Sequence, residues 1–120
     1  MDLTFTDEPT DHIAIPAAIR EIFLPAMRSD QRRLASAAQL QRLDLMRQML
    51  HRIRGALVIV SAQHLADTAW LIEDAIAKGA ATEDCLEFTE RFLATLDSAL
   101  SGLETSEWQR NDTYSLLPSA

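Results

Sequence analysis

The sequence predicts an all-α fold, an antiparallel up-down-up-down four-helix bundle with one short extra N-terminal helix. Residues that favour helices, such as alanine, leucine, glutamate and arginine, are plentiful. Aromatic residues make up only 6% of the chain and β-branched residues are sparse, so strands are not expected. Apolar residues recur at helical spacing in stretches joined by short connections, which place neighbouring helices antiparallel. A chain of 120 residues is long enough to bury one modest core.

The chain divides into three expected segments. Residues 1–12 are polar and acidic and are expected to form a flexible lead-in. Residues 13–104 carry the apolar helical pattern and are expected to form the bundle. The pattern fades after Glu104, which predicts a C-terminal tail over residues 105–120.

Two prolines near the start of the bundle set the expected helix boundaries there. Pro16 fits the first turn of a short helix, where a missing N–H costs nothing. Pro25 does not fit a helix interior, because proline removes a backbone hydrogen bond and clashes with the preceding turn. Either a new helix begins near Leu24 or a longer helix is kinked there. We favour a short first helix followed by a second helix over residues 24–39.

The third helix has the clearest pattern and contains the most informative histidine. Its apolar residues follow a 3-4-3-4-3 spacing, which places them on one stripe facing a bundle core. His51 lies off this stripe, about 100° around the helix from Leu50, and we expect it to be exposed. The stripe consists of Leu43, Met46, Leu50, Ile53, Leu57 and Val60.

Residues typical of helix ends predict where the last two helices begin. Ser61 is expected to cap the N-terminus of a helix over residues 62–78, and Gly79 is expected to stop it. Thr82 is expected to cap the final helix, whose first turn carries two acidic residues that suit the positive end of the helix dipole.

The charge of the chain is unevenly distributed. Its net charge of −7 argues against a general nucleic-acid binder, which needs a basic face. From Gly55 onwards, three basic residues face eleven acidic ones. The other half holds a cationic island, which is either an ordinary solvated face or a docking site for an acidic pocket of a partner. The island consists of Arg28, Arg32, Arg33, Arg42, Arg47, Arg52 and Arg54.

Several classes of site are not expected. We see no secretory leader and no apolar stretch of membrane-spanning length. Cys85 is the single cysteine, so an internal disulfide and a multi-cysteine metal site are excluded, and we expect it to be buried. The histidines His12, His51 and His64 do not pair at helical spacing, so neither a metal nor another cofactor is expected. No Gly-rich phosphate loop is present, so the chain is not expected to be a kinase. A monomer in the cytoplasm is expected.

His51 stands out because its helical neighbours fit one chemistry. A neutral imidazole is a good nucleophile towards phosphorus near neutral pH. Arg54, one turn later, could hold phosphoryl oxygens and spread the charge that develops in transfer. Arg47, one turn earlier, could assist, and Gly55 leaves room for a phosphorylated partner to approach. On these residues alone, an exposed helical histidine without any chemical role is an equally good interpretation.

Residues 51–73 resemble the signature of the histidine-containing phosphotransfer (HPt) domain family. His51 matches the phosphoacceptor, Arg54 the basic residue that follows it, and Gly55 the glycine. With upstream matches in the preceding helix, the resemblance extends over roughly residues 15–103. The remaining matches are Phe23, Asp30, Leu34, Ala37, Ile53, Val60, Ala62, Leu65, Ile72 and Glu73.

Four positions depart from the family signature. Ala56 and Leu57 replace two small hydroxyl residues, and Ala56 thereby removes one possible hydrogen bond near the site. Ser61 replaces the usual glycine, and Ala69 replaces a common cysteine. These departures leave the matched histidine, cation and glycine intact.

The resemblance implies a phosphorelay function in two-component signalling. His51 would accept a phosphoryl group from a receiver-domain aspartate and pass it to another receiver, with no autonomous kinase activity. Arg54 would act as a phosphoryl clamp and Gly55 would provide clearance. The implied partners are receiver domains and an upstream hybrid histidine kinase, and the chain resembles the modules at the C-terminal end of such kinases. The residues expected to bind a receiver are Met27, Arg47, Gln48, Val58 and Ile59.

Two other classes of function stay open at this point. A helical interaction module could bind receivers or another signalling protein without carrying phosphate, and Ala56 in place of a hydroxyl residue keeps this alternative open. A helical subunit or small-molecule-binding bundle could have a cavity lined by methionines, although methionine at helical spacing is more often a core residue. The methionines concerned are Met27, Met46 and Met49.

Overall fold

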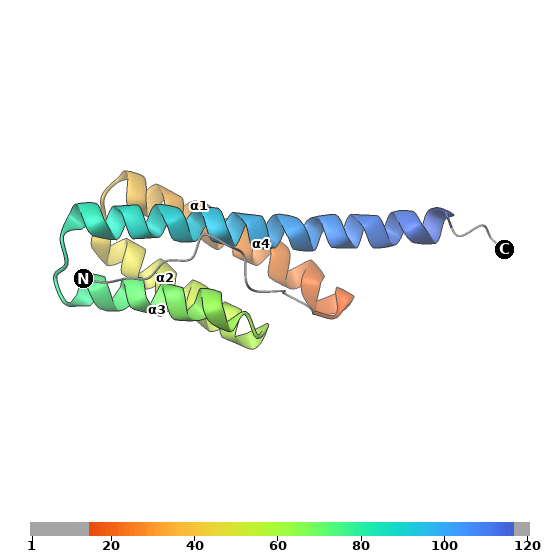
Figure 1. Cartoon of the computed structure of the whole chain (residues 1–120), viewed down its shortest axis with the longest axis horizontal. Coiled ribbons are helices and arrows are strands. Elements are labelled where there is room, and N and C mark those ends of the chain that lie inside the picture. The colour runs from red at the N-terminus through yellow and green to blue at the C-terminus, as the bar shows by residue number, and fades with distance from the viewer. Residues whose placement is uncertain (1–14, 117–120) are drawn as a thin grey trace.

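The computed structural model describes residues 15–116, and the side chains of residues 15–104. Within that range it contains four helices and no strand, which confirms the all-α prediction. Successive helices run in opposite directions (Figure 1), and the first and third each pack against both the second and the fourth. No helix in the described part is long and apolar enough to cross a bilayer. The helices are α1 (Ala17–Gln39), α2 (Leu43–Ile59), α3 (Gln63–Ala77) and α4 (Thr82–Leu116).

Helix α1 is continuous through Pro25, so the prediction of a separate short helix before residue 24 was wrong. The buried stripe of α1 passes on both sides of the proline, with Phe23 and Met27 in the core and Pro25 itself exposed. Burying Phe23 and Met27 contributes about 1.5–3 kcal/mol each. That contribution offsets the roughly 3 kcal/mol that an interior proline costs.

The core is built from the apolar stripes of the four helices. In α2, Leu50, Ile53 and Leu57 have no exposed surface, which confirms the stripe predicted from their spacing. Cys85 in α4 is also fully buried, as predicted. Burial raises the pKa of the Cys85 thiol, so the side chain stays protonated and acts as a small apolar residue.

Three helices end in the same way, with one residue in the left-handed region. Gln41, Ser61 and Gly79 follow α1, α2 and α3 with φ values of 54°, 61° and 78°. Backbone N–H groups then turn back to carbonyls of the last turn, as in the 2.9 Å bond from Ala62 N to Leu57 O. Gly79 therefore stops α3 as predicted. Ser61 belongs to the end of α2, and Ala62 holds the N-cap position of α3, so the capping prediction for Ser61 was wrong.

Helix α4 is longer than the apolar pattern indicates. Its first i→i−4 hydrogen bond runs from Cys85 N to Ala81 O, so Ala81 and not Thr82 holds the cap position. The helix continues past Glu104 to Leu116 and projects beyond the other three helices (Figure 1). No glycine or proline interrupts residues 103–117. The predicted lead-in and the last four residues of the predicted tail lie outside the described residues.

Candidate functional site

His51 lies in the middle of α2, on the side turned away from the core. Its neighbours Leu50 and Ile53 are fully buried, whereas 71% of the His51 side chain is exposed. This confirms that the histidine stands off the apolar stripe. An imidazole in this position can be reached by another protein without any rearrangement of the bundle.

Three side chains meet around the imidazole. His51 Nδ1 lies 3.0 Å from Glu73 Oε1 on α3, and Arg54 Nε donates to Glu73 Oε2 at 2.6 Å. Arg54 Nη2 also lies 2.9 Å from His51 Nδ1. The Glu73 side chain is only 10% exposed. A buried carboxylate on α3 therefore ties together the histidine and the arginine, which lie one turn apart on α2.

The tautomer of His51 decides which ring nitrogen can act as a nucleophile. If Nδ1 carries the proton, it donates to Glu73, and Nε2 keeps its lone pair. If Nδ1 is bare, it accepts from Arg54, and Nε2 carries the proton. The first arrangement supplies a donor to each oxygen of the buried Glu73 carboxylate, which a buried charge requires. No hydrogen bond engages Nε2 within the described part of the chain.

Glu73 contacts both His51 and Arg54, although the sequence analysis did not include it among the site residues. It was matched to the end of the family signature but was given no role. A signal was present, since Glu73 lies four residues after Ala69 and seven after Ala66, both of which are buried. A carboxylate on the core-facing side of a helix needs a partner when it is buried.

Gly55 leaves an open surface next to the histidine. A Cβ atom added to Gly55 would meet no atom of the described residues within 4 Å. Packing among these residues therefore does not require a glycine here, although a glycine inside a helix costs about 1 kcal/mol relative to alanine. The space beside Gly55 lies open on the surface of α2.

A shallow hollow of about 430 Å³ surrounds His51 on the α2–α3 side. Arg47 and Gln48, two of the residues predicted to bind a partner, line it together with the imidazole. The other lining residues are Asp44 and Glu73.

An apolar groove of about 260 Å³ lies between α1 and the C-terminal half of α2. Ile59, predicted to bind a partner, lines it and is 81% exposed, and Ile22 on α1 is 75% exposed. Val58 is exposed but lies outside this groove. Met27 was predicted to contribute to docking, yet it is only 2% exposed. Because Met27 is on the core stripe of α1, it offers a partner at most the floor of the groove, and the prediction is corrected accordingly.

The cationic island is partly neutralised by the fold. Arg28 pairs with Asp97 and Glu104. The other ion pairs that arginines of the island make are Arg42–Asp44, Arg52–Asp30 and Arg54–Glu73. Within the described part of the chain, no ion pair engages Arg32, Arg33 or Arg47. Three guanidinium groups of the island are therefore free of ion pairs among the described residues, and the other four are ion-paired. Among the same residues, no three histidine, cysteine, aspartate or glutamate side chains gather where they could hold a metal ion.

The comparison with protein families decides what kind of module this is. The model of the Hpt domain family matches residues 18–106, which is most of the chain. The chain belongs to the Hpt domain family. This confirms the resemblance found in the sequence, and with it the four-helix bundle and the assignment to two-component phosphorelay signalling. Hpt domains are phosphocarriers that work with receiver domains and histidine kinases. No curated protein and no solved structure matches the chain.

Proposed function

We propose that this Hpt domain is a phosphorelay intermediate that accepts a phosphoryl group on His51 Nε2 and passes it to another receiver. The observation that carries the proposal is the contact between His51 Nδ1 and the buried Glu73 carboxylate. In the proposed tautomer, Nδ1 donates to Glu73 in this contact, which leaves the lone pair of Nε2 available on an exposed ring.

In the proposed transfer, Nε2 attacks the phosphorus of an aspartyl phosphate on a docked receiver. The N–P bond forms as the P–O bond to the aspartate breaks, and the aspartate leaves as a carboxylate. The imidazole ring becomes positively charged as Nε2 gives up its lone pair. Glu73 faces the Nδ1–H of that ring at 3.0 Å and stabilises the new charge. Transfer to the second receiver reverses these bond changes.

Arg54 has two proposed roles in this reaction. Its Nε bond to Glu73 fixes the carboxylate in position. Its Nη2 group, 2.9 Å from Nδ1, cannot donate to a protonated nitrogen and is free to turn towards phosphoryl oxygens. Arg54 thus acts as the phosphoryl clamp that the family resemblance implies, and Arg47 adds positive charge in the same hollow.

The receiver is proposed to dock over Gly55 and the apolar groove beside it. Gly55 allows close approach to the helix, and the exposed Ile22 and Ile59 side chains provide apolar surface. Because one exposed face suffices, we propose that the chain acts as a monomer, in the cytoplasm, between a hybrid histidine kinase and its receivers.

A second candidate function is an interaction module that binds receivers without carrying phosphate. The observation that favours it is Ala56, which lines the apolar groove where the family usually has a hydroxyl residue. Docking by apolar contact would survive the loss of that hydroxyl group even if transfer did not.

The test is transfer of radiolabelled phosphate from a phosphorylated receiver to the chain. We expect acid-labile, alkali-stable label on the wild type and none on His51→Gln. His64→Gln is the matched control, because it removes a histidine outside the site, and we expect it to accept label normally. Label retained on His51→Gln would refute the assignment of His51. Receiver binding without any label on the wild type would favour the interaction module.

A further inference from the structure

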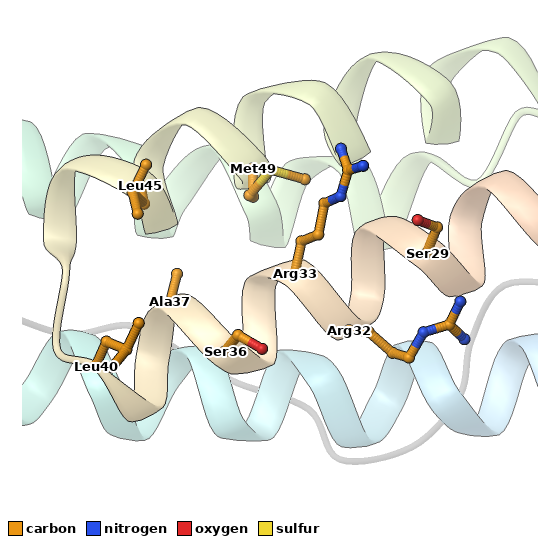
Figure 2. A pocket seen from close by; sticks show the side chains of 8 residues that line it. All are labelled: Ser29, Arg32, Arg33, Ser36, Ala37, Leu40, Leu45 and Met49. Carbon is orange, nitrogen blue, oxygen red and sulfur yellow. The ribbon is translucent and has the colours of Figure 1, made fainter.

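A second groove lies at the other end of the α1–α2 seam, away from the apolar groove that Ile22 and Ile59 line. It has a volume of about 470 Å³, and Figure 2 shows the side chains that line it. Asp30, which is buried and pairs with Arg52, lines the apolar groove but not the second one. The second groove is lined by Ser29, Arg32, Arg33, Ser36, Ala37, Leu40, Leu45 and Met49.

Two arginines in this groove lack the ion pairs that Arg28, Arg42, Arg52 and Arg54 make. Within residues 15–104, no ion pair engages Arg32 or Arg33. Arg28, one turn earlier on the same helix, binds two carboxylates of α4, Asp97 and Glu104. The chain carries 18 acidic residues against 11 basic ones, so carboxylates are plentiful. Free guanidinium groups on such a chain provide charge complementarity for an acidic ligand.

The groove has a charged end and an apolar end. Figure 2 shows Arg33 reaching from α1 towards α2 beside Met49, while Arg32 lies on the opposite flank of α1. Leu40 and Leu45 lie at the other end, near the connection between the helices. Leu40 is 69% exposed. A ligand that fits must therefore be acidic over part of its length and apolar over the rest.

We propose that this groove binds an acidic amphipathic helical segment of a partner protein. The lining residues of α1 span positions 29–40, which is about 16 Å or three helical turns. That length matches a short helix with apolar anchors at i, i+3, i+4 and i+7. The anchors would cover Leu40, Leu45 and Met49, and the carboxylates would meet the two guanidinium groups, which bind carboxylates in a bidentate manner.

The proposed segment would leave the phosphotransfer site free. The hollow around His51 is lined by α2 and α3. The apolar groove, where the receiver is proposed to dock, is lined by α1 residues in the range 19–30, whereas the α1 residues that line the second groove lie in the range 29–40. A partner held there could remain bound while one receiver replaces another at His51. The proposal itself concerns binding and does not depend on phosphate transfer.

The test uses a capped peptide of about twelve residues with leucines on one helical face and glutamates towards one end. Backbone amide shifts of the full chain are followed by NMR during titration. We expect shifts concentrated in residues 29–49, and binding that weakens as salt is raised. A control peptide with lysine in place of glutamate should leave these amides unchanged.

Single substitutions then test whether Arg32 and Arg33 bind the carboxylates of the peptide. Arg32→Gln and Arg33→Gln should each weaken peptide binding by up to about fivefold, the range for exposed ion pairs. Lys78→Gln is the matched control, since it removes the same charge from the end of α3, and it should bind the peptide as the wild type does. Thermal unfolding checks that all three variants fold equally well.

Three results would overturn the proposal. One is absence of shifts in residues 29–49, and another is equal weakening by Lys78→Gln. The third is that inorganic phosphate alone moves the same amides with the affinity of the peptide, which would indicate a small-anion site. His51→Gln should bind the peptide normally, so failure here and failure of phosphate transfer are separate outcomes.

Discussion

Two arginine-centred networks in this bundle contain similar residues but differ in which partner is buried. Around Arg54, the carboxylate of Glu73 is 10% exposed and the histidine it holds is 71% exposed. Around Arg28, the arginine is the more buried partner, and the carboxylates of Asp97 and Glu104 face solvent. A buried carboxylate can orient an exposed nucleophile because packing fixes its position. Exposed carboxylates only link two helices, here α1 and α4.

Two exposed glycines, one on α2 and one on α4, provide the first test of this difference. Gly55 and Gly102 are both exposed in helices, and a Cβ at either would meet no atom within 4 Å in the part of the chain that the structure describes. Leucine should therefore raise the free energy of unfolding at both positions, by about 0.8 kcal/mol through helix propensity. Only Gly55→Leu should obstruct a docked receiver, and misplacing the reacting atoms should reduce transfer on the order of a hundredfold.

Transfer kinetics and urea unfolding of the two leucine variants provide the measurement. Gly102→Leu should transfer phosphate at the wild-type rate. Normal transfer by Gly55→Leu would show that the receiver does not pass over this position.

The second test removes one carboxylate from each network. Glu73→Ala should lower the transfer rate by about tenfold to a hundredfold, because the bond to the imidazolium that forms in transfer is lost. It should also lower the free energy of unfolding by about 1–3 kcal/mol, since Arg54 loses its buried partner. Asp97→Ala should leave transfer unchanged and cost under about 1 kcal/mol.

Single-turnover transfer from a phosphorylated receiver measures the first effect, and urea unfolding measures the second. Equal transfer rates for the two alanine variants would mean that Glu73 has only a structural role.

These comparisons show which parts of the molecule the sequence could predict. The stripe through Leu50, Ile53 and Leu57 depends only on helical spacing, and the exposure of His51 follows from that stripe. The contact with Glu73 depends on how α3 turns back against α2, and therefore on the conformation of the connection. Ser61 adopts a left-handed conformation there, at the position where the family usually has glycine. Local propensity indicated a cap at that residue and could not reveal the turn.

The other incorrect predictions also came from local sequence rules, which do not include contacts between distant segments. Pro25 predicted a break from local rules, but burial on both sides of it keeps α1 continuous. The cationic island was predicted from the positions of arginines along the chain. In the folded chain, Asp97 and Glu104 of α4 pair with Arg28. Contacts between distant segments decide which charges stay free, and the sequence contains no local signal for them.

The third test replaces each arginine with lysine. Arg54 Nε donates to Glu73, and its Nη2 group is proposed to turn towards phosphoryl oxygens. A single ammonium group cannot do both in the same geometry. Arg54→Lys should therefore slow transfer by about threefold to tenfold, equivalent to one lost hydrogen bond. Arg28→Lys should transfer normally, since its contacts lie on the α1–α4 side. The measurement is the same single-turnover assay, and an unchanged rate for Arg54→Lys would mean that positive charge alone suffices.

The smallest expected effect is the acid sensitivity of the α1–α4 network. Hydrogen bonds from Arg28 and then Gln31 hold the pKa of Asp97 below its ordinary value. A lowered pKa in the folded state contributes stability above the ordinary aspartate pKa of about 3.9, and this contribution is lost as the pH falls through the folded value. Because 58% of the Asp97 side chain is exposed, the contribution should stay under about 1 kcal/mol. Between about pH 5 and pH 3, Asp97→Asn should lose less free energy of unfolding than the wild type does, and Arg28→Gln should behave like it. A steeper loss in Asp97→Asn would show that the ion pair does not stabilise the bundle, and that the exposed network is a by-product of helix packing.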